Sequence, residues 1–343
     1  MNNHPASLVL VTGGSGFVGG HAVVAAVRAG YRVRTTVRSA DRAAEVVAAA
    51  ARQGIDAGPS VEFAVAELTA DDGWAEAMTG VEHVLHIASP FPASDPKNAD
   101  EVIAPARDGV LRVLAAAREA GVRRVVLTSS FAAVGYSPSP DQSYDETSWT
   151  DPADDNTAYV RSKAVAEQAA WDFVRTSGGP ELTVLNPGGI MGPAISPKLS
   201  SSVGVIQAML TGRMPAVPRL PFGMVDVRDL ADLHVRAMTH PDAAGQRFLA
   251  VGDRTTTFFE IGRVLARHFP DRAGQVPAVE LTDDQVRAAA PTAPALAGVV
   301  RQLGRDPVIS TAKVKGVLGW SPRTAEETIV DTAQSLFDLG LVD

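Results

Sequence analysis

The stretch Leu8-Val-Leu-Val-Thr-Gly-Gly-Ser-Gly-Phe-Val-Gly19 decides the fold, because it joins an apolar strand to a helix through a turn of glycines. Leu8 to Val11 is wholly apolar, as a strand covered on both faces of a sheet should be. Gly13, Gly16 and Gly19 follow where the backbone must turn sharply and approach a pyrophosphate more closely than a Cβ would permit. Free N–H groups of the following helix would point at those phosphates. Glycines that serve packing alone are the alternative, but the flanking strand and helix favour a dinucleotide-binding turn.

The rest of the first half repeats this alternation of apolar strands and alanine-rich helices. Strands are predicted at residues 8–11, 31–37, 61–65, 81–87 and 125–128, and helices at 17–29, 41–52 and 102–120. Strands separated by helices imply βαβ units, a parallel sheet and right-handed crossovers. Beyond residue 185 the sequence becomes rich in Gly, Pro and Ser, and helices dominate from Phe258 onward. We therefore expect an α/β fold: a Rossmann-type doubly wound parallel sheet with a smaller, mostly helical C-terminal substrate domain.

The same change of pattern sets the expected domain boundaries. Residues 1–186 are predicted to form the dinucleotide-binding Rossmann domain, and the segment 224–251, with strands near residues 225 and 250, returns to it. Residues 187–223 and 252–343 are predicted to form the substrate-binding domain. The chain has 343 residues, which is enough for both.

Composition narrows the possible partners. The 39 acidic residues exceed the 31 Lys and Arg, giving a formal charge of -8, which argues against nucleic acid and anionic membranes. Without cysteine, disulfides, thiolate zinc sites and cysteine nucleophiles are excluded. The first seven residues lack a basic n-region, and no apolar run approaches the ~20 residues of a membrane span. We expect a cytoplasmic protein that acts on a small molecule, as a monomer or a homodimer.

The second predicted strand indicates which nucleotide binds. An NAD site places an acidic residue about 20 residues past the glycines, at the end of this strand. Residues 31–40 contain no Asp or Glu; the strand ends in Thr36-Val37-Arg38, and Arg42 follows. A guanidinium can bind a 2′-phosphate bidentately, whereas a carboxylate would repel it. Two ordinary surface arginines are the alternative, but the pattern favours NADP(H) as cofactor.

A phenol and an amine form the candidate catalytic pair. Tyr159 and Lys163 are four residues apart in a helical stretch and so share one helix face. Hydride transfer to a carbonyl carbon leaves an oxyanion that must take a proton. A free phenol has a pKa near ~10, and an adjacent ammonium stabilises its anion. Lys163 can also reach the nicotinamide ribose. A surface pair is the alternative, but the pair follows the fifth strand of a nucleotide-binding domain.

A third donor is needed to hold the carbonyl oxygen. Thr128-Ser129-Ser130 closes the fifth strand, at the carboxyl edge where ligands bind in open α/β sheets. Ser130 is the first choice and Ser129 the second. Either serine could equally be a turn residue.

Taken together, these motifs resemble the extended short-chain dehydrogenase/reductases, within the NAD-dependent epimerase/dehydratase superfamily. Further segments resemble the dihydroflavonol reductase-like branch of carbonyl and aldehyde reductases, and the match runs over about residues 7 to 341. The segments that carry the branch resemblance are Thr36-Val-Arg38, His86-Ile-Ala-Ser-Pro90, Asn186-Pro-Gly-Gly-Ile-Met-Gly-Pro193, Val225-Asp-Val-Arg-Asp229 and Leu318-Gly-Trp-Ser-Pro-Arg323.

The resemblance implies an NADP-dependent oxidoreductase acting on CH–OH groups. It would reduce a ketone or aldehyde reversibly, with Tyr159 as general acid and with Ser130 and Lys163 completing the catalytic set. Glu67 stands where the family usually has Asp beside the adenine. The cofactor-binding residues implied by the glycine loop and by the resemblance are Thr12, Gly13, Ser15, Gly16, Phe17, Val18, Arg38, Arg42, Glu67, Leu68, Ala88, Ser89, Thr128, Tyr159, Lys163, Pro187, Gly188, Gly189 and Ile190.

The substrate pocket is expected beside the nicotinamide position. Its candidate residues flank that position and are mostly apolar, so a simple core role is the alternative. They are Ser89, Phe91, Phe131, Met191, Ile195, Met209 and Phe222.

Two polar groups have structural interpretations. His83 and His86 are three apart in a predicted strand, where alternation sends them to opposite faces, so no metal site is predicted. Asp226, Arg228 and Asp229 are interpreted as a charge network at the start of a helix.

Two other functions stay open at this point. A nucleotide-sugar epimerase or dehydratase shares the loop and the Tyr–Lys pair but retains NAD(P), and Arg38 with the apolar pocket argues against it. A non-catalytic NADP-sensing regulator has no use for Tyr159 and Lys163 together.

Overall fold

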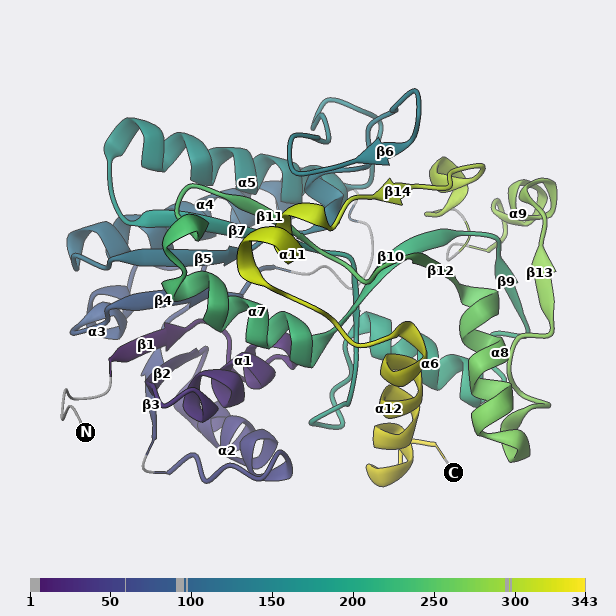
Figure 1. Cartoon of the computed structure of the whole chain (residues 1–343), viewed down its shortest axis with the longest axis horizontal. Coiled ribbons are helices and arrows are strands. Elements are labelled where there is room, and N and C mark those ends of the chain that lie inside the picture. The colour runs from purple at the N-terminus through teal and green to yellow at the C-terminus, as the bar shows by residue number, and fades with distance from the viewer. Residues whose placement is uncertain are drawn as a thin grey trace.

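Seven parallel strands form the central sheet of the computed structural model, which describes residues 7–58, 60–90, 96, 98–293, 296 and 298–342. The strand order is β11-β7-β5-β4-β1-β2-β3 (Figure 1). These strands are β1 (Leu8–Val11), β2 (Arg32–Val37), β3 (Val61–Val65), β4 (His83–His86), β5 (Arg124–Thr128), β7 (Glu181–Pro187) and β11 (Arg247–Ala250). The predicted Rossmann-type sheet is confirmed. The inner strand β1 is wholly apolar and buried because both of its faces are covered.

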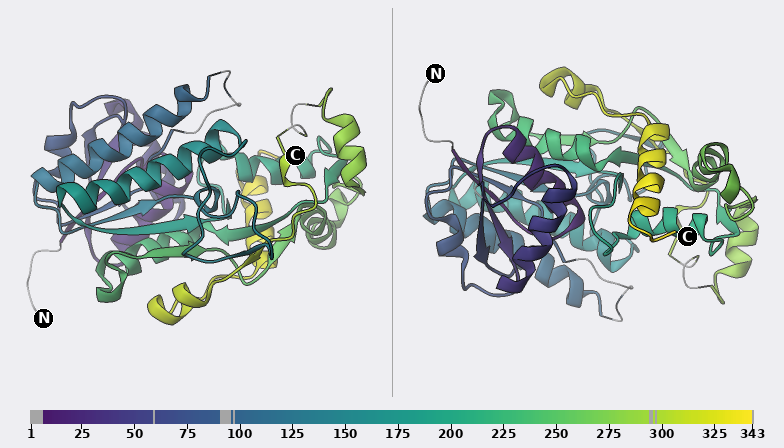
Figure 2. Two further views of the ribbon diagram at one scale, coloured as in Figure 1. Left: turned by 90° about the horizontal axis from the view of Figure 1, so that it is seen from above. Right: turned by 90° about the horizontal axis from the view of Figure 1, so that it is seen from below.

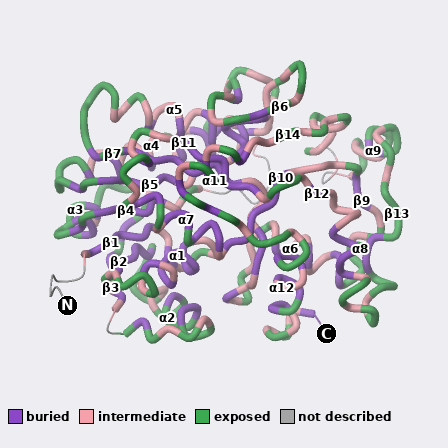
Figure 3. Tube along the Cα trace, in the orientation of Figure 1, coloured by how far each residue is buried: buried purple, intermediate pink, exposed green. Residues whose placement is uncertain are grey.

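Helices cover both faces of this sheet, as two views of the molecule show (Figure 2). On one face, an apolar core joins the sheet to α1 (Phe17–Arg28), α2 (Ala43–Arg52), α7 (Val227–Thr239) and α11 (Ala312–Leu318). On the other face, a second core joins it to α3 (Trp74–Met78), α4 (Asp100–Glu119) and α5 (Ala158–Ser177). Buried residues accordingly concentrate in the strands, while the outer helix faces are exposed (Figure 3). None of the helices in the described residues has the length and apolar character needed to cross a bilayer.

A smaller part of the chain lies beyond the carboxyl ends of the strands (Figure 1). This part has an apolar core of its own, separate from the two cores beside the central sheet, and helices α6, α8 and α12 supply most of it. The helices here are α6 (Ser201–Leu210), α8 (Phe258–His268), α9 (Asp283–Ala289) and α12 (Ala325–Asp338). The short strands outside the central sheet are β6 (Ser143–Tyr144), β8 (Gly189–Met191), β9 (Ala216–Pro218), β10 (Pro221–Asp226), β12 (Thr255–Thr257), β13 (Val279–Leu281) and β14 (Val308–Ile309).

The two strands of the returning segment belong to different sheets. The strand near residue 250 joins the central sheet, because β11 pairs with β7. The strand near residue 225 does not. It is β10, which pairs with β8 and β12 in a separate three-stranded sheet. The chain returns to the central sheet only with α7, so the exact partition into two domains remains a proposal.

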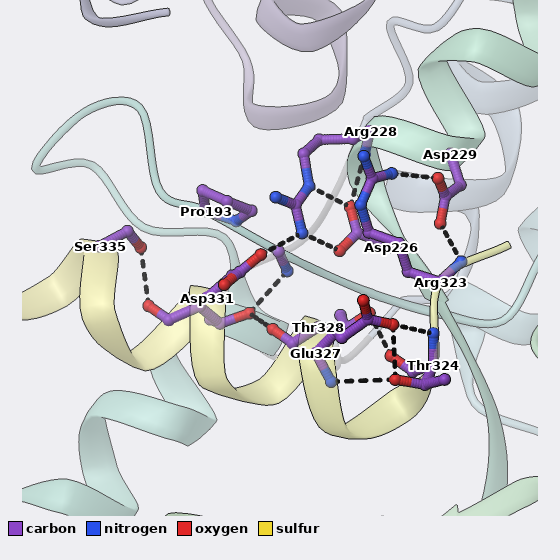
Figure 4. Close-up of polar contacts among 12 residues, drawn as sticks. Pro193, Asp226, Arg228, Asp229, Arg323, Thr324, Glu327, Thr328, Asp331 and Ser335 are labelled. Carbon is purple, nitrogen blue, oxygen red and sulfur yellow. Dashed lines mark hydrogen bonds and ion pairs between the residues drawn. The ribbon is translucent and has the colours of Figure 1, made fainter. Parts of the chain in front are cut away.

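The predicted charge network connects α7 with the C-terminal helix α12 (Figure 4). The buried Asp226 carboxylate caps α7 by accepting from the Arg228 N–H at 2.8 Å. The Arg228 guanidinium lies 2.7 Å from Asp226 and 2.7 Å from Asp331 of α12. Asp229 binds the side chain of Arg323, just before α12. The network therefore fixes the C-terminal helix to the start of α7.

Candidate active site

The glycine turn follows β1 and contacts the ends of β2 and β4, the strands on either side of β1. Gly13 has a φ of +74°, and a Cβ there would lie 3.1 Å from the Ala88 Cβ. Its N–H donates to Thr36 Oγ1 at 3.0 Å. A Cβ at Gly19 would lie only 2.1 Å from the Gly13 carbonyl oxygen. Gly16 begins α1 without any side-chain cap, which leaves the first N–H groups of the helix available to an anion.

Thr12 organises the segment after β4. Its Oγ1 accepts hydrogen bonds from the N–H groups of Ile87 and Ala88, both at 2.9 Å. It also lies 2.9 Å from Nδ1 of His86. Burial lowers the pKa of His86 to about 3, so its ring is neutral and can accept the Thr12 proton. Thr12 is fully buried, so its hydroxyl positions the loop rather than presenting itself to a ligand.

Two arginines follow β2, where the sequence placed them. Arg38 is exposed and makes no hydrogen bond or ion pair within the described part of the chain. Arg42 pairs with Glu45 at 2.6 Å, while its buried Nε has no partner there. Both groups can therefore receive an anion such as a phosphate.

The hydroxyl of Tyr159 is hydrogen-bonded to the side chain of Ser130. Tyr159 stands at the start of α5, whose N-cap is the Thr157 hydroxyl. Burial raises the pKa of Tyr159, and the bond to Ser130 only partly opposes this. The adjacent ammonium was expected to make the phenol proton easier to give; in the structure burial has the larger effect on the pKa of Tyr159 and keeps the phenol in its protonated, acid form.

Lys163 lies one helical turn further along the same face. Its Nζ donates to Ser89 Oγ, at the end of the β4 segment, at 2.9 Å. The ammonium is 5.8 Å from the centre of the Tyr159 ring. Burial lowers the pKa of Lys163 to about 8, although the Glu167 carboxylate raises it. Ser89 follows Ala88, and Ala88 adjoins Gly13, so the lysine and the glycine turn both contact the short segment after β4.

The two candidate serines point in different directions. Ser130 faces Tyr159, and its Oγ accepts from the Ala132 N–H at 3.1 Å. Ser129 is buried and donates to Glu167 at 2.5 Å. Only Ser130 is therefore placed to share a substrate oxygen with the phenol.

Known proteins match both the sequence and this arrangement. The sequence model of the NAD dependent epimerase/dehydratase family matches residues 9–252. The chain belongs to this family. Cinnamoyl-CoA reductase CAD2 of Medicago truncatula is 34% identical over 273 residues, which are 77% of this chain and 81% of that protein. Dihydroflavonol 4-reductase of Hordeum vulgare is 32% identical over 273 residues, 77% of this chain and 75% of that protein.

A solved structure agrees over nearly the whole length. Yeast methylglyoxal/isovaleraldehyde reductase Gre2, complexed with NADPH, superposes with a TM-score of 0.78 at 28% identity. The alignment covers 97% of this chain and 99% of that one. The resemblance to extended short-chain dehydrogenase/reductases of the dihydroflavonol reductase-like branch is confirmed.

The other predicted cofactor residues of this family member come from the start of α1 and from the end of β7 with β8. Ser15, Phe17 and Val18 are half-buried at the start of α1. Pro187 is buried, and Gly188, Gly189 and Ile190 are half-buried along β8. A Cβ at Gly188 would lie 2.1 Å from the Gly223 carbonyl oxygen, so close strand pairing requires glycine there.

A small pocket lies between the ends of β4 and β5 and the helices α4 and α5. Leu68, Ala88, Ser89 and Thr128 line it together with Lys163. The Thr128 hydroxyl also bonds His234 of α7 at 2.6 Å. The exposed side chain of Glu67 is not among the lining groups.

Most of the predicted substrate residues lie in apolar cores. Phe131, Met191, Ile195 and Met209 are all buried, and Met209 is completely so, within the core of the smaller part. Met209 therefore offers no surface to a substrate in this structure. Phe91 lies outside the described residues.

Ser89 and Phe222 remain accessible. The Phe222 ring adjoins Gly189 of β8 and stacks on Phe258, with ring centres 5.0 Å apart. Phe222 is thus the one aromatic residue among the described pocket candidates that is both accessible and next to the predicted nicotinamide strand.

Sequence reasoning missed two groups beside the catalytic pair. Tyr136 lies close enough to raise the pKa of Tyr159 electrostatically, and nothing in the sequence marks it. Glu167 lies one helical turn after Lys163 on α5, and its carboxylate accepts a hydrogen bond from Arg247 of β11. A signal for Glu167 was present, because the spacing of four from Tyr159 to Lys163 repeats from Lys163 to Glu167.

Proposed function

We propose that this protein reduces a ketone or aldehyde to an alcohol with NADPH, reversibly. The observation that carries the proposal is the hydrogen bond between Tyr159 and Ser130 beside a buried Lys163 that donates to Ser89. Support also comes from the relatives, which are reductases by name, and from the NADPH complex of yeast Gre2.

The residues present fit an NADP cofactor. The turn from Gly13 to Gly19 is tight enough that a Cβ at Gly14 or Gly19 would clash with the protein's own atoms, and the uncapped N-terminus of α1 suits a pyrophosphate. Arg38 and the unpartnered Nε of Arg42 suit a 2′-phosphate. Lys163 and Ser89 suit a ribose. When bound, NADPH supplies the hydride for the carbonyl carbon.

The protein supplies the proton and holds the oxygen. Ser130 Oγ accepts from a backbone N–H, so the hydroxyl uses its own proton as a donor, to Tyr159 in this structure and to the carbonyl oxygen when a substrate is bound. Tyr159, kept protonated by burial, transfers its proton to that oxygen as the C–H bond forms. The Lys163 ammonium then stabilises the phenolate until water returns a proton.

We also propose a division of labour between the two parts of the chain. Residues 1–186 with 224–251 bind the cofactor, and residues 187–223 with 252–343 complete the substrate site. Phe222 supports this, because it comes from the second part and its ring adjoins Gly189.

NADPH oxidation followed at 340 nm tests the proposal. Wild-type protein should consume NADPH with some members of a panel of aromatic and aliphatic ketones, aldehydes and flavanones, and should prefer NADPH to NADH run in parallel. Tyr159→Phe should abolish turnover, while Tyr31→Phe, at the distant turn before β2, should not. Substrate conversion without net NADPH loss would instead indicate an isomerase or lyase, and normal function of Tyr159→Phe a non-catalytic regulator.

A further inference from the structure

A buried carboxylate lies below the catalytic pair and has no part in the proposed reaction. Glu167 is on α5, four residues after Lys163 and eight after Tyr159, and its side chain is 1% exposed. Acidic side chains are almost never fully buried unless they are paired, because removing a charge from water costs several kcal/mol. This site must therefore be compensated by specific contacts.

Three adjacent strands of the central sheet provide those contacts. Arg247 of β11 donates from Nε to the Glu167 carboxylate at 2.6 Å. Asn186 of β7 donates from Nδ2 at 2.7 Å, and Ser129 after β5 donates from Oγ at 2.5 Å. The order β11-β7-β5 makes these strands neighbours. One carboxylate thus fastens α5 to the end of the sheet.

The groups that bind Glu167 also hold the other half of the active site. Ser129 immediately precedes Ser130. Asn186 Nδ2 donates a second hydrogen bond to the Ser130 carbonyl oxygen at 3.2 Å. The same contacts therefore connect the helix that carries the phenol and ammonium to the strand end that carries the serine.

Arg247 is itself rigidly held. Its Nη1 donates to the carbonyl oxygens of Glu146 and Ser148 at 3.0 and 2.9 Å. Its guanidinium carbon lies 3.6 Å from the centre of the Trp149 ring, a stacked cation–π arrangement. The side chain is 7% exposed, so water competes little with the ion pair.

We propose that Glu167, paired with Arg247, is a positioning residue that holds Tyr159 and Lys163 in register with Ser130 and keeps the lysine ammonium charged. The inference rests on the roles proposed above for these three residues. It does not depend on which carbonyl compound is the substrate.

The charge on the Lys163 side chain depends on the titratable and charged groups around it. On α5 these are Tyr159 and Glu167, and on β4 the neutral His86; Arg247 faces the far side of Glu167. Glu167 supplies the negative charge that raises the pKa of Lys163 against the larger effect of burial. Glu167→Gln removes that charge, so the lysine pKa should fall below about 8 and the ammonium should be lost at lower pH.

Two readouts test the positioning role. We expect kcat of Glu167→Gln to fall by about 10²-fold, since misplaced catalytic groups cost about that much. NADPH binding, followed by cofactor fluorescence, should weaken with rising pH around 8 in the wild type and at lower pH in the variant. The fluorescence readout needs no turnover, so it stays informative if the reductase assignment fails.

A paired variant separates positioning from folding. Glu167→Gln leaves Arg247 buried without its partner and so lowers Tm, whereas Glu167→Gln with Arg247→Met removes both charges and should recover much of the Tm. The low kcat and the shifted binding profile should persist in this double variant. Glu181→Gln, which alters the Arg124 ion pair at the other end of the same strands, is the matched control and should leave the pH profile unchanged.

Wild-type kcat and an unshifted NADPH binding profile in the double variant would overturn the proposal and leave Glu167 a purely structural residue. A shifted binding profile in a protein whose wild type reduces no carbonyl would preserve the link between Glu167 and Lys163 and refute the proposed function instead.

Discussion

Gly19→Ala is the sharpest test of the phosphate turn. The added Cβ would lie 2.1 Å from the oxygen and 2.7 Å from the carbon of the Gly13 carbonyl, whereas ordinary contact begins at 3.4 Å. Both obstacles are backbone, so no rotamer change relieves the clash. Either α1 or the turn must move by about an ångström. Overpacking of this kind costs about 1–3 kcal/mol.

That strain falls on the N–H groups proposed to bind the pyrophosphate. If the whole of this strain energy is lost from cofactor binding, the affinity for NADPH should fall about 5- to 150-fold, because about 1.4 kcal/mol corresponds to a tenfold change in affinity. Titration of NADPH fluorescence measures the affinity, and thermal melting measures what fraction of the strain reaches stability. Gly316→Ala is the control, because Gly316 is in α11 with open space around it, and alanine there should raise stability by about 0.5–1 kcal/mol. Unchanged NADPH affinity in Gly19→Ala would refute the assignment of the turn.

Three other predictions concern the cofactor choice, the reaction and stability. Arg38→Ala should weaken NADPH about tenfold and leave NADH unchanged, because an exposed charge-assisted contact is of that order, whereas Arg32→Ala should change neither. Equal losses for both cofactors would contradict this. Ser130→Ala should lower kcat about 10²-fold with little change in Tm, as for loss of one oxyanion donor; an unchanged kcat would remove Ser130 from the site. Burial holds the pKa of His21 and His234 at about 4, below the ordinary 6.5, so the unfolded chain binds more protons between these values. Stability present above pH 6.5 should fall by about 2 kcal/mol for each histidine on acidification to pH 5, as denaturant titrations would show.

Six of the seven strands of the central sheet were predicted because their signals are local, whereas β7 (Glu181–Pro187) was not predicted. Apolar runs bounded by glycines mark the buried strands, and the glycine turn fixes where the first strand meets its helix. Local signals could not assign the strand at Val225 to a sheet. A short apolar run looks alike in either sheet, and only its pairing with Gly189 to Met191 distinguishes them.

The sequence predicted the relative positions of catalytic groups only where their spacing along one helix determines them. Four residues along a helix necessarily place Tyr159 and Lys163 on one face. Adjacent residues diverge, so Ser129 and Ser130 could not both face the phenol, but the sequence does not say which does. The partner of Glu167 is 80 residues away in the chain, beyond any local pattern.

The substrate pocket was the least predictable feature. Apolar side chains that line a pocket and those that fill a core have the same sequence pattern, and Met209 belongs to the core. Phe222 differs only through tertiary neighbours, namely Gly189 and Phe258.

Transfer of deuterium from NADPH labelled at C4 of the nicotinamide tests the central claim most directly. The wild-type protein, given a carbonyl substrate identified at 340 nm, should deliver one deuteron to the carbinol carbon, detectable by mass spectrometry of the alcohol. Tyr159→Phe should deliver almost none. Converted substrate without the label, or equal labelling by Tyr159→Phe, would contradict carbonyl reduction by this phenol.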